Sequence, residues 1–163
     1  MLHVEASPRK QRSASLEVAR AFLDSLQEKV PGVRVDTMDL WDMALPEFEG
    51  ATLQAKYAGL EGRARTPQEA LAWTTINALA DRLKKADLLL FSVPMWNWTV
   101  PYKLKHLIDL VSQKDVLFTF DERGMNGLLS GVRAVCIYAR GADFTPGVGF
   151  PMTWDHQRPF MET

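Results

Sequence analysis

The sequence predicts an α/β fold in which a doubly wound parallel sheet has helices on both faces, in three layers. Residues 88–93 form a continuous apolar run, which is typical of a strand buried on both faces. Pro101 follows shortly afterwards and begins an amphipathic segment that extends to residue 111, as expected of a helix. Strand patterns and helix patterns alternate in this way along the chain, and this alternation favours a parallel sheet.

The length and the charge limit the classes of protein to consider. With 163 residues the chain has room for a single domain, residues 1–163, with a sizeable core. It is 47% hydrophobic and 24% charged, and its net charge of -1 does not favour nucleic acid or a membrane as a partner. The chain has no apolar run of roughly 20 residues and no signal-peptide pattern. Its single cysteine forms no internal disulfide, so we expect a cytoplasmic protein.

The first loop combines a strand end, hydroxyl side chains and a helix start. Residues 2–6 predict a short strand, and an amphipathic helix begins near Ser13 or Ser15, either of which is a natural N-cap. Serine hydroxyls and backbone N–H groups at a helix N-terminus also bind phosphate, and we favour this interpretation over simple capping. The glycine patterns GxGxxG and GxxxxGK[ST] are missing, which counts against a Rossmann dehydrogenase and a P-loop NTPase. A monophosphate fits the loop better.

The loop over residues 94–100 is the second candidate ligand site. It places Trp96, Asn97 and Trp98 after the central strand, at the edge where open α/β sheets bind ligands. A loop that faces water seldom contains two tryptophans without a binding role. A flat apolar ligand that also needs hydrogen bonds would account for them.

The middle of the chain has a clear strand and a clear helix with an irregular segment between them. Residues 32–40 alternate apolar and polar side chains and predict a strand at or near an edge of the sheet. Residues 41–66 follow no period, so we expect a long excursion that serves as a lid or as an interface segment. Thr66 and Glu69 form a capping box, which predicts a helix that continues to about residue 86.

The last third predicts an extended excursion and a fourth strand. Residues 116–120 and 124–129 flank a turn that contains glycine, and residues 132–138 form an apolar run. Cys136 lies in this run, where a small buried core residue is the expected role. The chain then stops where a further helix is starting, so we expect a fold that is clipped at both ends and lacks its last strand and helix.

Residues 139–144 form a third candidate loop at the same sheet edge. Gly141 lets the backbone approach a ligand closely, and Arg140 either meets an anion or lies in solvent. A glycine after a strand is often only a turn, so this loop alone is weak evidence. Three candidate loops on one edge are stronger evidence than any one of them.

These pieces together resemble the azoreductases, which are FMN-dependent NADH:quinone oxidoreductases. The resemblance rests on the serine loop, on the segment from Met95 to Trp98, on the helix that Pro101 begins, and on the Arg140-Gly141 pair. It covers nearly the whole chain in order and spacing. It implies a flavodoxin-like fold and a homodimer with one FMN per subunit, bound at the subunit interface.

The resemblance also implies roles for individual residues. The FMN phosphate would be held by Ser7, Ser13 and Ser15, and the isoalloxazine ring would be contacted by Met95, Trp96, Asn97, Trp98, Arg140, Gly141 and Ala142. Trp96 and Trp98 stand where the family often has tyrosine and phenylalanine, and Ala142 stands where it often has glycine. No residue is assigned a catalytic role and no metal is expected, because His3, His106 and His156 are too scattered for a zinc pattern.

The implied reaction is a ping-pong transfer of two electrons from NADH or NADPH to quinones or azo compounds, with FMN as the carrier. His156, in a late loop, is a further candidate for contact with substrate. Three alternatives remain open. They are an FMN-binding electron carrier, a flavin reductase that releases its product, and a dimeric binding module that uses the aromatic loop for a partner.

Overall fold

The computed structural model describes residues 1–163, which group into two compact units. The first, which we call the sheet unit, consists of Met1–Met43, Leu88–Lys105 and Arg133–Thr163. The second, which we call the helical unit, consists of Ala44–Asp87 and His106–Val132. None of the helices combines the length and the apolar character needed to cross a lipid bilayer.

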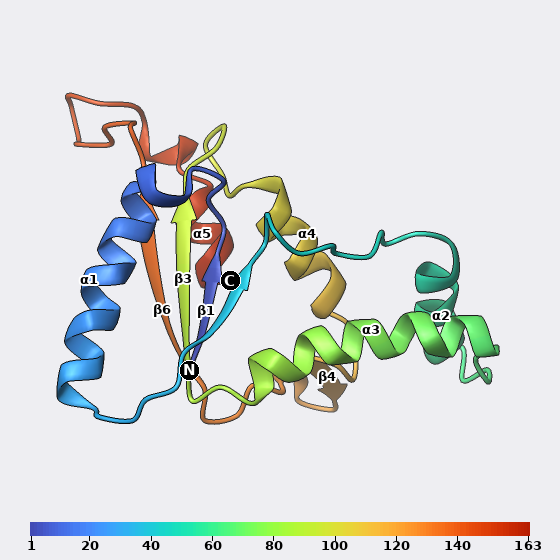
Figure 1. The fold of residues 1–163 in the computed structure, drawn as a ribbon. Helices are drawn as coiled ribbons and strands as arrows, with labels where there is room; N and C mark the ends of the chain where they lie inside the picture. Colours follow the sequence, from blue (N-terminus) through green and yellow to red (C-terminus); the bar gives the residue numbers. More distant parts are fainter. The chain divides into compact units, whose positions relative to one another are not determined.

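The sheet unit is built on four parallel strands in the order β2-β1-β3-β6. Their bounds are β1 Leu2–Glu5, β2 Asp36–Asp39, β3 Leu88–Pro94 and β6 Arg133–Ala139. The predicted parallel sheet is therefore confirmed, with the predicted second strand at an edge. Because the strands are parallel, their carboxyl ends meet at one edge of the sheet (Figure 1).

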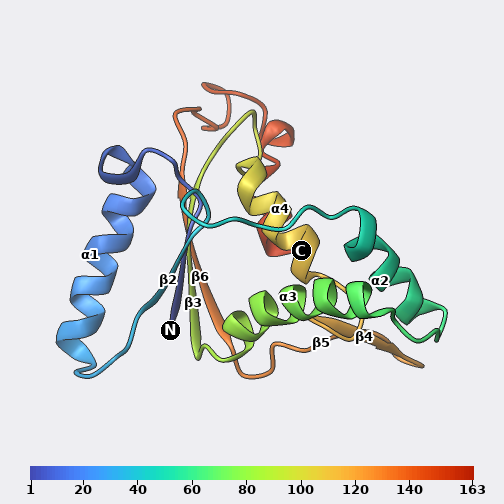
Figure 2. The ribbon, with the colours of Figure 1, turned by 45° about the vertical axis from the view of Figure 1, so that its right-hand side comes forward.

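Helices cover both faces of this sheet. The α1 helix (Ala14–Lys29) packs against β3 and β6, and α5 (Gln157–Glu162) lies over the opposite face (Figures 1 and 2). Leu2, Val4 and Leu90 are almost completely buried between these layers. The three-layer α/β arrangement predicted for the chain is thus confirmed.

The β6 strand is less buried than its apolar sequence predicts. It has a strand partner on one side only, and none of its side chains is fully buried. Cys136 is half-buried rather than a core residue, and burial raises the pKa of its thiol above the usual value. The thiol is therefore protonated at neutral pH, which does not favour a nucleophilic role.

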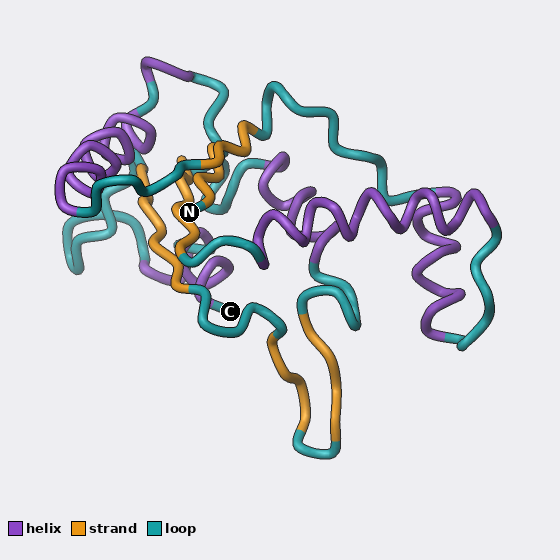
Figure 3. Tube along the Cα trace, turned by 60° about the horizontal axis from the view of Figure 1, so that its bottom comes forward, coloured by secondary structure: helices purple, strands orange, loops and turns teal.

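The helical unit contains α2 (Gly50–Leu60), α3 (Pro67–Lys84) and the antiparallel hairpin of β4 (Phe118–Asp121) and β5 (Gly124–Gly127). The hairpin, visible in Figure 3, confirms the predicted excursion with a glycine turn. The capping box is also confirmed, since Thr66 Oγ1 accepts from the Glu69 N–H and Glu69 Oε2 accepts from the Thr66 N–H.

The expectation that residues 41–66 are irregular is wrong over much of that range, because α2 occupies Gly50–Leu60. Its sequence hides the helix for a physical reason. Glycines occur at both ends of the segment, and its apolar side chains do not gather on one face, so the usual helical period is absent. The remaining helix, α4, extends over Tyr102–Val111, as Pro101 and the apolar period after it predict.

Candidate functional site

Three serine side chains lie where β1 ends and α1 begins. Ser7, Ser13 and Ser15 have exposed fractions of 1%, 3% and 0%. Ser13 occupies the N-cap position of α1, yet its hydroxyl makes no capping hydrogen bond and lies 3.2 Å from the Ser15 hydroxyl. The first N–H groups of any helix also lack partners within the helix. Hydroxyl and amide donors therefore collect at this point, as a phosphate group requires.

One basic residue of the serine loop, Lys10, is already paired. Lys10, whose φ is +49°, binds Asp39 and also lies 2.9 Å from the Asp42 carboxylate. Desolvation alone would lower the pKa of Lys10, but the hydrogen bonds to the two aspartates outweigh it and raise the pKa. Lys10 thus fastens the serine loop to the end of β2.

A buried polar contact joins β1 and β3. His3 Nε2 lies 2.8 Å from Ser92 Oγ, and its Nδ1 lies 3.5 Å from a carboxylate oxygen of Glu5. Burial lowers the pKa of His3, so its imidazole is neutral at pH 7. His3 therefore links two strands of the sheet. No three or more His, Cys, Asp or Glu side chains in the structure are grouped so that they could hold a metal ion.

The aromatic loop is a tight two-residue turn. Trp96 and Thr99 exchange both of their backbone hydrogen bonds, each 2.9 Å long, around Asn97 and Trp98. The φ angles of Asn97 and Trp98 are +44° and +69°, which is the left-handed pair that a type I′ turn needs. Tryptophan in this region costs about 1 kcal/mol or more. Contacts elsewhere must therefore hold the turn in place.

The two tryptophans of this loop belong to different aromatic clusters. The Trp96 ring centre lies 5.5 Å from that of Trp41 and 6.3 Å from that of Tyr102. The Trp98 ring instead contacts Phe144, Phe150 and Trp154, with centre separations of 6.2, 4.8 and 5.3 Å. Beside Trp96 is a largely apolar cavity of about 360 Å³, lined by Trp96, Asn97, Thr99, Val100, Tyr102, Lys105 and Phe160.

The loop after β6 is tied down through its arginine. Arg140 forms an ion pair with Asp155, and its guanidinium carbon lies 4.6 Å from the centre of the Phe144 ring. From the sequence we expect Arg140 to meet an anion or to lie in solvent. The structure instead pairs it with a carboxylate of the same chain, that of Asp155. No atom lies within 4 Å of the point where a Cβ on Gly141 would stand, so the backbone there is open to a ligand, and Ala142 beside it is half-buried.

The residues that lead into α5 hold two of these loops together. The backbone N–H of His156 donates to Trp98 O at 2.9 Å, and the side-chain amide of Gln157 donates to Val93 O at 2.9 Å. Asp155 accepts from Arg140 and from the backbone N–H of Gln157. The aromatic loop and the Arg140 loop are thus fixed by three consecutive residues, which we call the Asp155–Gln157 turn.

Asp155 is almost completely buried, with an exposed fraction of 4%. Burial alone would raise its pKa, but the hydrogen bonds from the Arg158 backbone and from the Arg140 side chain outweigh burial and lower the pKa. Asp155 is therefore ionised at neutral pH. Gln157 is fully buried, and its Oε1 has no hydrogen-bond partner in the protein, so it remains an acceptor for a ligand or a water molecule.

The sequence singled out His156 in this turn but missed its neighbours. The His156 side chain is exposed, and only its backbone contributes to the contact with the aromatic loop. The side chains of Asp155 and Gln157 fix the two loops. The sequence feature that could have identified Asp155 is its place just ahead of a short helix, where aspartate commonly binds backbone N–H groups. The ten residues predicted for the cofactor all lie in the sheet unit, nine of them in the loops that follow β1, β3 and β6 and Ser15 in the first turn of α1.

Comparison with known proteins gives consistent results. The model of a family described as having the flavodoxin-like fold matches residues 1–163. The chain is 52% identical, over its whole length and 79% of the relative, to FMN-dependent NADH:quinone oxidoreductase 9 of Burkholderia lata. It is 46% identical to FMN-dependent NADH:quinone oxidoreductase 3 of Pseudomonas fluorescens, with 99% of this chain and 76% of the relative covered. The crystal structure of an azoreductase from Bacillus anthracis superposes with a TM-score of 0.86 at 25% identity, covering 99% of this chain and 77% of that one.

Proposed function

The chain belongs to the family with the flavodoxin-like fold, and from this premise we propose that it is an FMN-dependent oxidoreductase which transfers electrons from NADH or NADPH to quinones or azo compounds. The observation that carries the proposal is the cluster of Ser7, Ser13 and Ser15 at the start of α1. The Ser13 hydroxyl, at the N-cap position, is not used to cap the helix.

The donor set at the sheet edge fits FMN. Ser7, Ser13 and Ser15, together with the first amides of α1, would hold the phosphate, since hydroxyl and N–H donors match its oxygens. The loops of Met95–Trp98 and Arg140–Ala142 would contact the ring, because they offer aromatic surface and open backbone at the same edge. FMN, when bound, supplies the hydride and electron chemistry that no side chain of this chain can supply.

The protein groups position this chemistry. Arg140 is neutralised by Asp155, so it orients its loop and adds little net charge beside the ring. The type I′ turn at Asn97 and Trp98 places Trp96, Asn97 and Thr99 on the lining of one cavity, where a flat ligand has access to them. We assign a ping-pong order, in which the nicotinamide leaves before the acceptor binds, because one open aromatic slot serves flat substrates in turn.

The proposal extends to the assembly and the compartment. We assign a homodimer, supported by large exposed apolar side chains in the helical unit, among them Leu71 at 71% and Met125 at 67%. Light scattering on the purified protein tests this assignment.

We place the protein in the cytoplasm, where its unpaired Cys136 stays reduced. The single domain over residues 1–163 is likewise our proposal, supported by the family match over that range.

The experiment is a binding comparison between FMN and riboflavin, which differ by the phosphate. We expect Ser15→Ala to weaken FMN binding about tenfold, because one hydrogen bond to a charged group is lost, and to leave riboflavin binding unchanged. Ser25→Ala, an exposed serine on the same helix, is the matched control. Equal affinity of the wild type for the two flavins would contradict the phosphate site.

Turnover is tested separately on the FMN-loaded protein. Under anaerobic conditions NADH or NADPH should bleach the visible flavin band, and a quinone should restore it. A band that stays unchanged would indicate an electron carrier, and a bleached flavin that is lost on gel filtration would indicate a flavin reductase. A protein that binds no flavin would indicate a binding module.

A further inference from the structure

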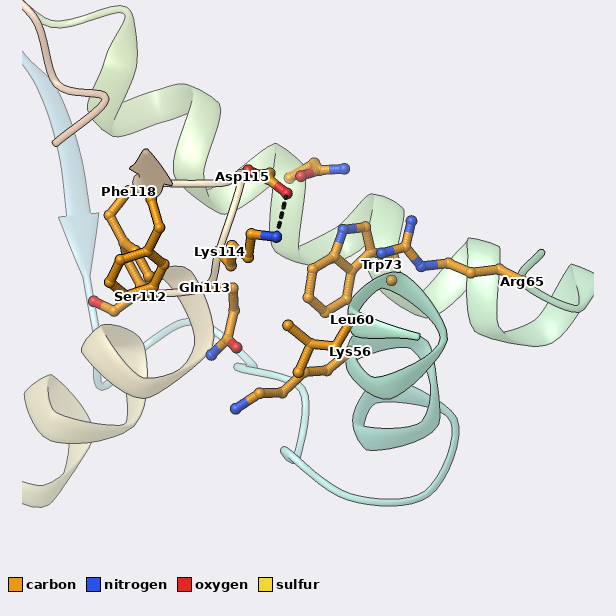
Figure 4. Close-up of a pocket in the computed structure, with 12 residues that line it drawn as sticks. Lys56, Leu60, Arg65, Trp73, Ser112, Gln113, Lys114, Asp115 and Phe118 are labelled. Atoms are coloured by element: carbon orange, nitrogen blue, oxygen red, sulfur yellow. Dashed lines mark ion pairs between the residues drawn. The ribbon is translucent and has the colours of Figure 1, made fainter. Parts of the chain in front are cut away.

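A second cavity, of about 510 Å³, lies entirely within the helical unit. Its walls come from α2 and α3, from the residues that follow α4, and from β4 (Figure 4). Trp73 and Leu60 line one side and Phe118 lines the other, with Lys114 and Asp115 between them (Figure 4). This volume is in the range of cavities that bind small molecules.

The guanidinium of Arg65 has a defined position in this cavity. Its Nε donates to Ala55 O at 2.9 Å, and its guanidinium carbon lies 4.6 Å from the centre of the Trp73 ring. The guanidinium also uses the space left by Gly59, because a Cβ on that residue would stand 2.7 Å from Arg65 Nη2. The α2 sequence thus makes room for this arginine, and its side chain is already in place before a ligand binds.

The charges around the cavity do not cancel. Three cations, Lys56, Arg65 and Lys114, face a single carboxylate, Asp115. Lys114 lies 3.9 Å from that carboxylate, which also accepts a hydrogen bond from Thr119 at 2.8 Å. Lys56 and Arg65 instead lie over aromatic rings, Phe48 at 5.5 Å and Trp73 at 4.6 Å. The cavity therefore has a positive excess, with a preorganised guanidinium that no carboxylate satisfies.

The apolar part of the lining is aromatic. Trp73 is 8% exposed and forms a rigid wall behind Arg65. Phe118 and Phe120 pack edge to face on β4, with ring centres 5.4 Å apart. Leu60, at the end of α2, is 51% exposed and completes an apolar surface on which a planar ring can lie. Flat faces beside fixed cations suit a ligand that is both aromatic and anionic.

We propose that this cavity is a binding site for a small planar aromatic anion, a carboxylate or a sulfonate, whose acid group binds Arg65 and whose ring lies between Leu60 and Phe118. Lys56 and Lys114 add attraction for the anion, and Gly59 keeps Arg65 in position. The site is separate in sequence and in unit from the loops assigned to FMN. It does not rest on the oxidoreductase assignment.

The test uses the full chain and calorimetric titration with naphthalene-2-sulfonate. We expect saturable one-to-one binding that weakens at least tenfold for the neutral naphthalene-2-sulfonamide, because only the sulfonate carries the charge that Arg65 recognises. If the two probes bind equally, or if no saturable binding is seen at millimolar probe, the proposal is wrong.

Two variants locate the binding. Arg65→Met should weaken sulfonate binding about tenfold by removing the guanidinium, and Gly59→Ala should weaken it by displacing the guanidinium without changing the charge. Arg133→Met, which removes an exposed arginine of the sheet unit, is the control and should leave the affinity unchanged. Circular dichroism verifies that each variant is folded.

The outcomes separate this site from the proposed enzyme. Sulfonate affinity that responds to Arg65→Met and Gly59→Ala supports the site, whatever the flavin experiments give. If Arg65→Met and Gly59→Ala both leave the affinity for the sulfonate unchanged, the proposed site is wrong. Affinity that falls as the protein concentration is raised through the range of self-association would assign the cavity to a second copy of the chain, and would also overturn the proposal.

Discussion

Arg140 and Arg65 make the same stacking contact and have different partners. Each guanidinium carbon lies 4.6 Å from the centre of an aromatic ring, that of Phe144 in the sheet unit and that of Trp73 in the helical unit. Arg140 is also paired with the buried carboxylate of Asp155, whereas Arg65 donates only to a backbone carbonyl. The presence of a carboxylate partner determines what each arginine does. Arg140, paired with Asp155, fixes a loop, whereas Arg65, which has no carboxylate partner, is available to an anion from solution.

Removing the carboxylate should have the largest effect. Asp155→Asn removes the charge that binds Arg140 and weakens the acceptor of the backbone N–H groups of Gln157 and Arg158, and we expect the free energy of unfolding to fall by about 3 kcal/mol. Urea denaturation followed by circular dichroism measures this loss. Asp24→Asn, an exposed aspartate on α1, is the control and should change stability by less than about 0.5 kcal/mol. A similar small change for Asp155→Asn would mean that the pair does not fix the loop.

Acid should sharpen the comparison through a second arginine–carboxylate pair, Arg63 and Glu69. The hydrogen bonds from Arg63, with those from Thr66, lower the pKa of Glu69 from 4.5 to about 2. A lowered pKa means that this stabilisation is present above pH 4.5 and is lost as the pH falls toward 2. We expect Glu69→Gln to be less stable than the wild type at pH 7 and to approach it at pH 2. A difference independent of pH would contradict this. The effect should be smaller than for Asp155, because Arg63 is 43% exposed.

The unpaired arginine should matter less for stability. Arg65→Met removes one stacking contact and one hydrogen bond, so we expect a loss of about 1 kcal/mol or less. Arg140→Met, in contrast, leaves Asp155 buried and unpaired and should cost about 2 kcal/mol or more. Thermal unfolding of the two variants side by side provides the measurement. Equal losses would remove the distinction between the two arginines.

The smallest expected effect is in the aromatic loop. Asn97→Gly relieves a left-handed backbone, but glycine also loses more freedom on folding, so the two contributions nearly cancel. We expect a change in the free energy of unfolding within about 0.5 kcal/mol, measured by urea denaturation. A loss above about 1 kcal/mol would show that the Asn97 side chain itself holds the turn.

Local patterns in the sequence predicted much of the sheet unit. The apolar run of β3 and the loops at the carboxyl ends of the strands each depend on neighbouring residues, and the same holds for the capping box of Thr66 in the helical unit. The α2 helix was missed because its period is weak and glycines flank it. The pair of Arg140 and Asp155 was missed because no local pattern specifies a contact between residues 15 positions apart. The half-burial of β6 arises because it is an edge strand, and the order of strands in the sheet cannot be predicted from the sequence of one strand.

The Asp155–Gln157 turn has a consequence for local unfolding. The Asp155–Gln157 turn holds Trp98 O, Val93 O and Arg140, so the two loops share one anchor and displacing it releases both of them. The two loops therefore belong to one cooperative opening unit. A ligand that contacts either loop slows the opening of both, and the His156 amide, bonded to Trp98 O, reports this as slower hydrogen exchange even when the ligand does not touch it.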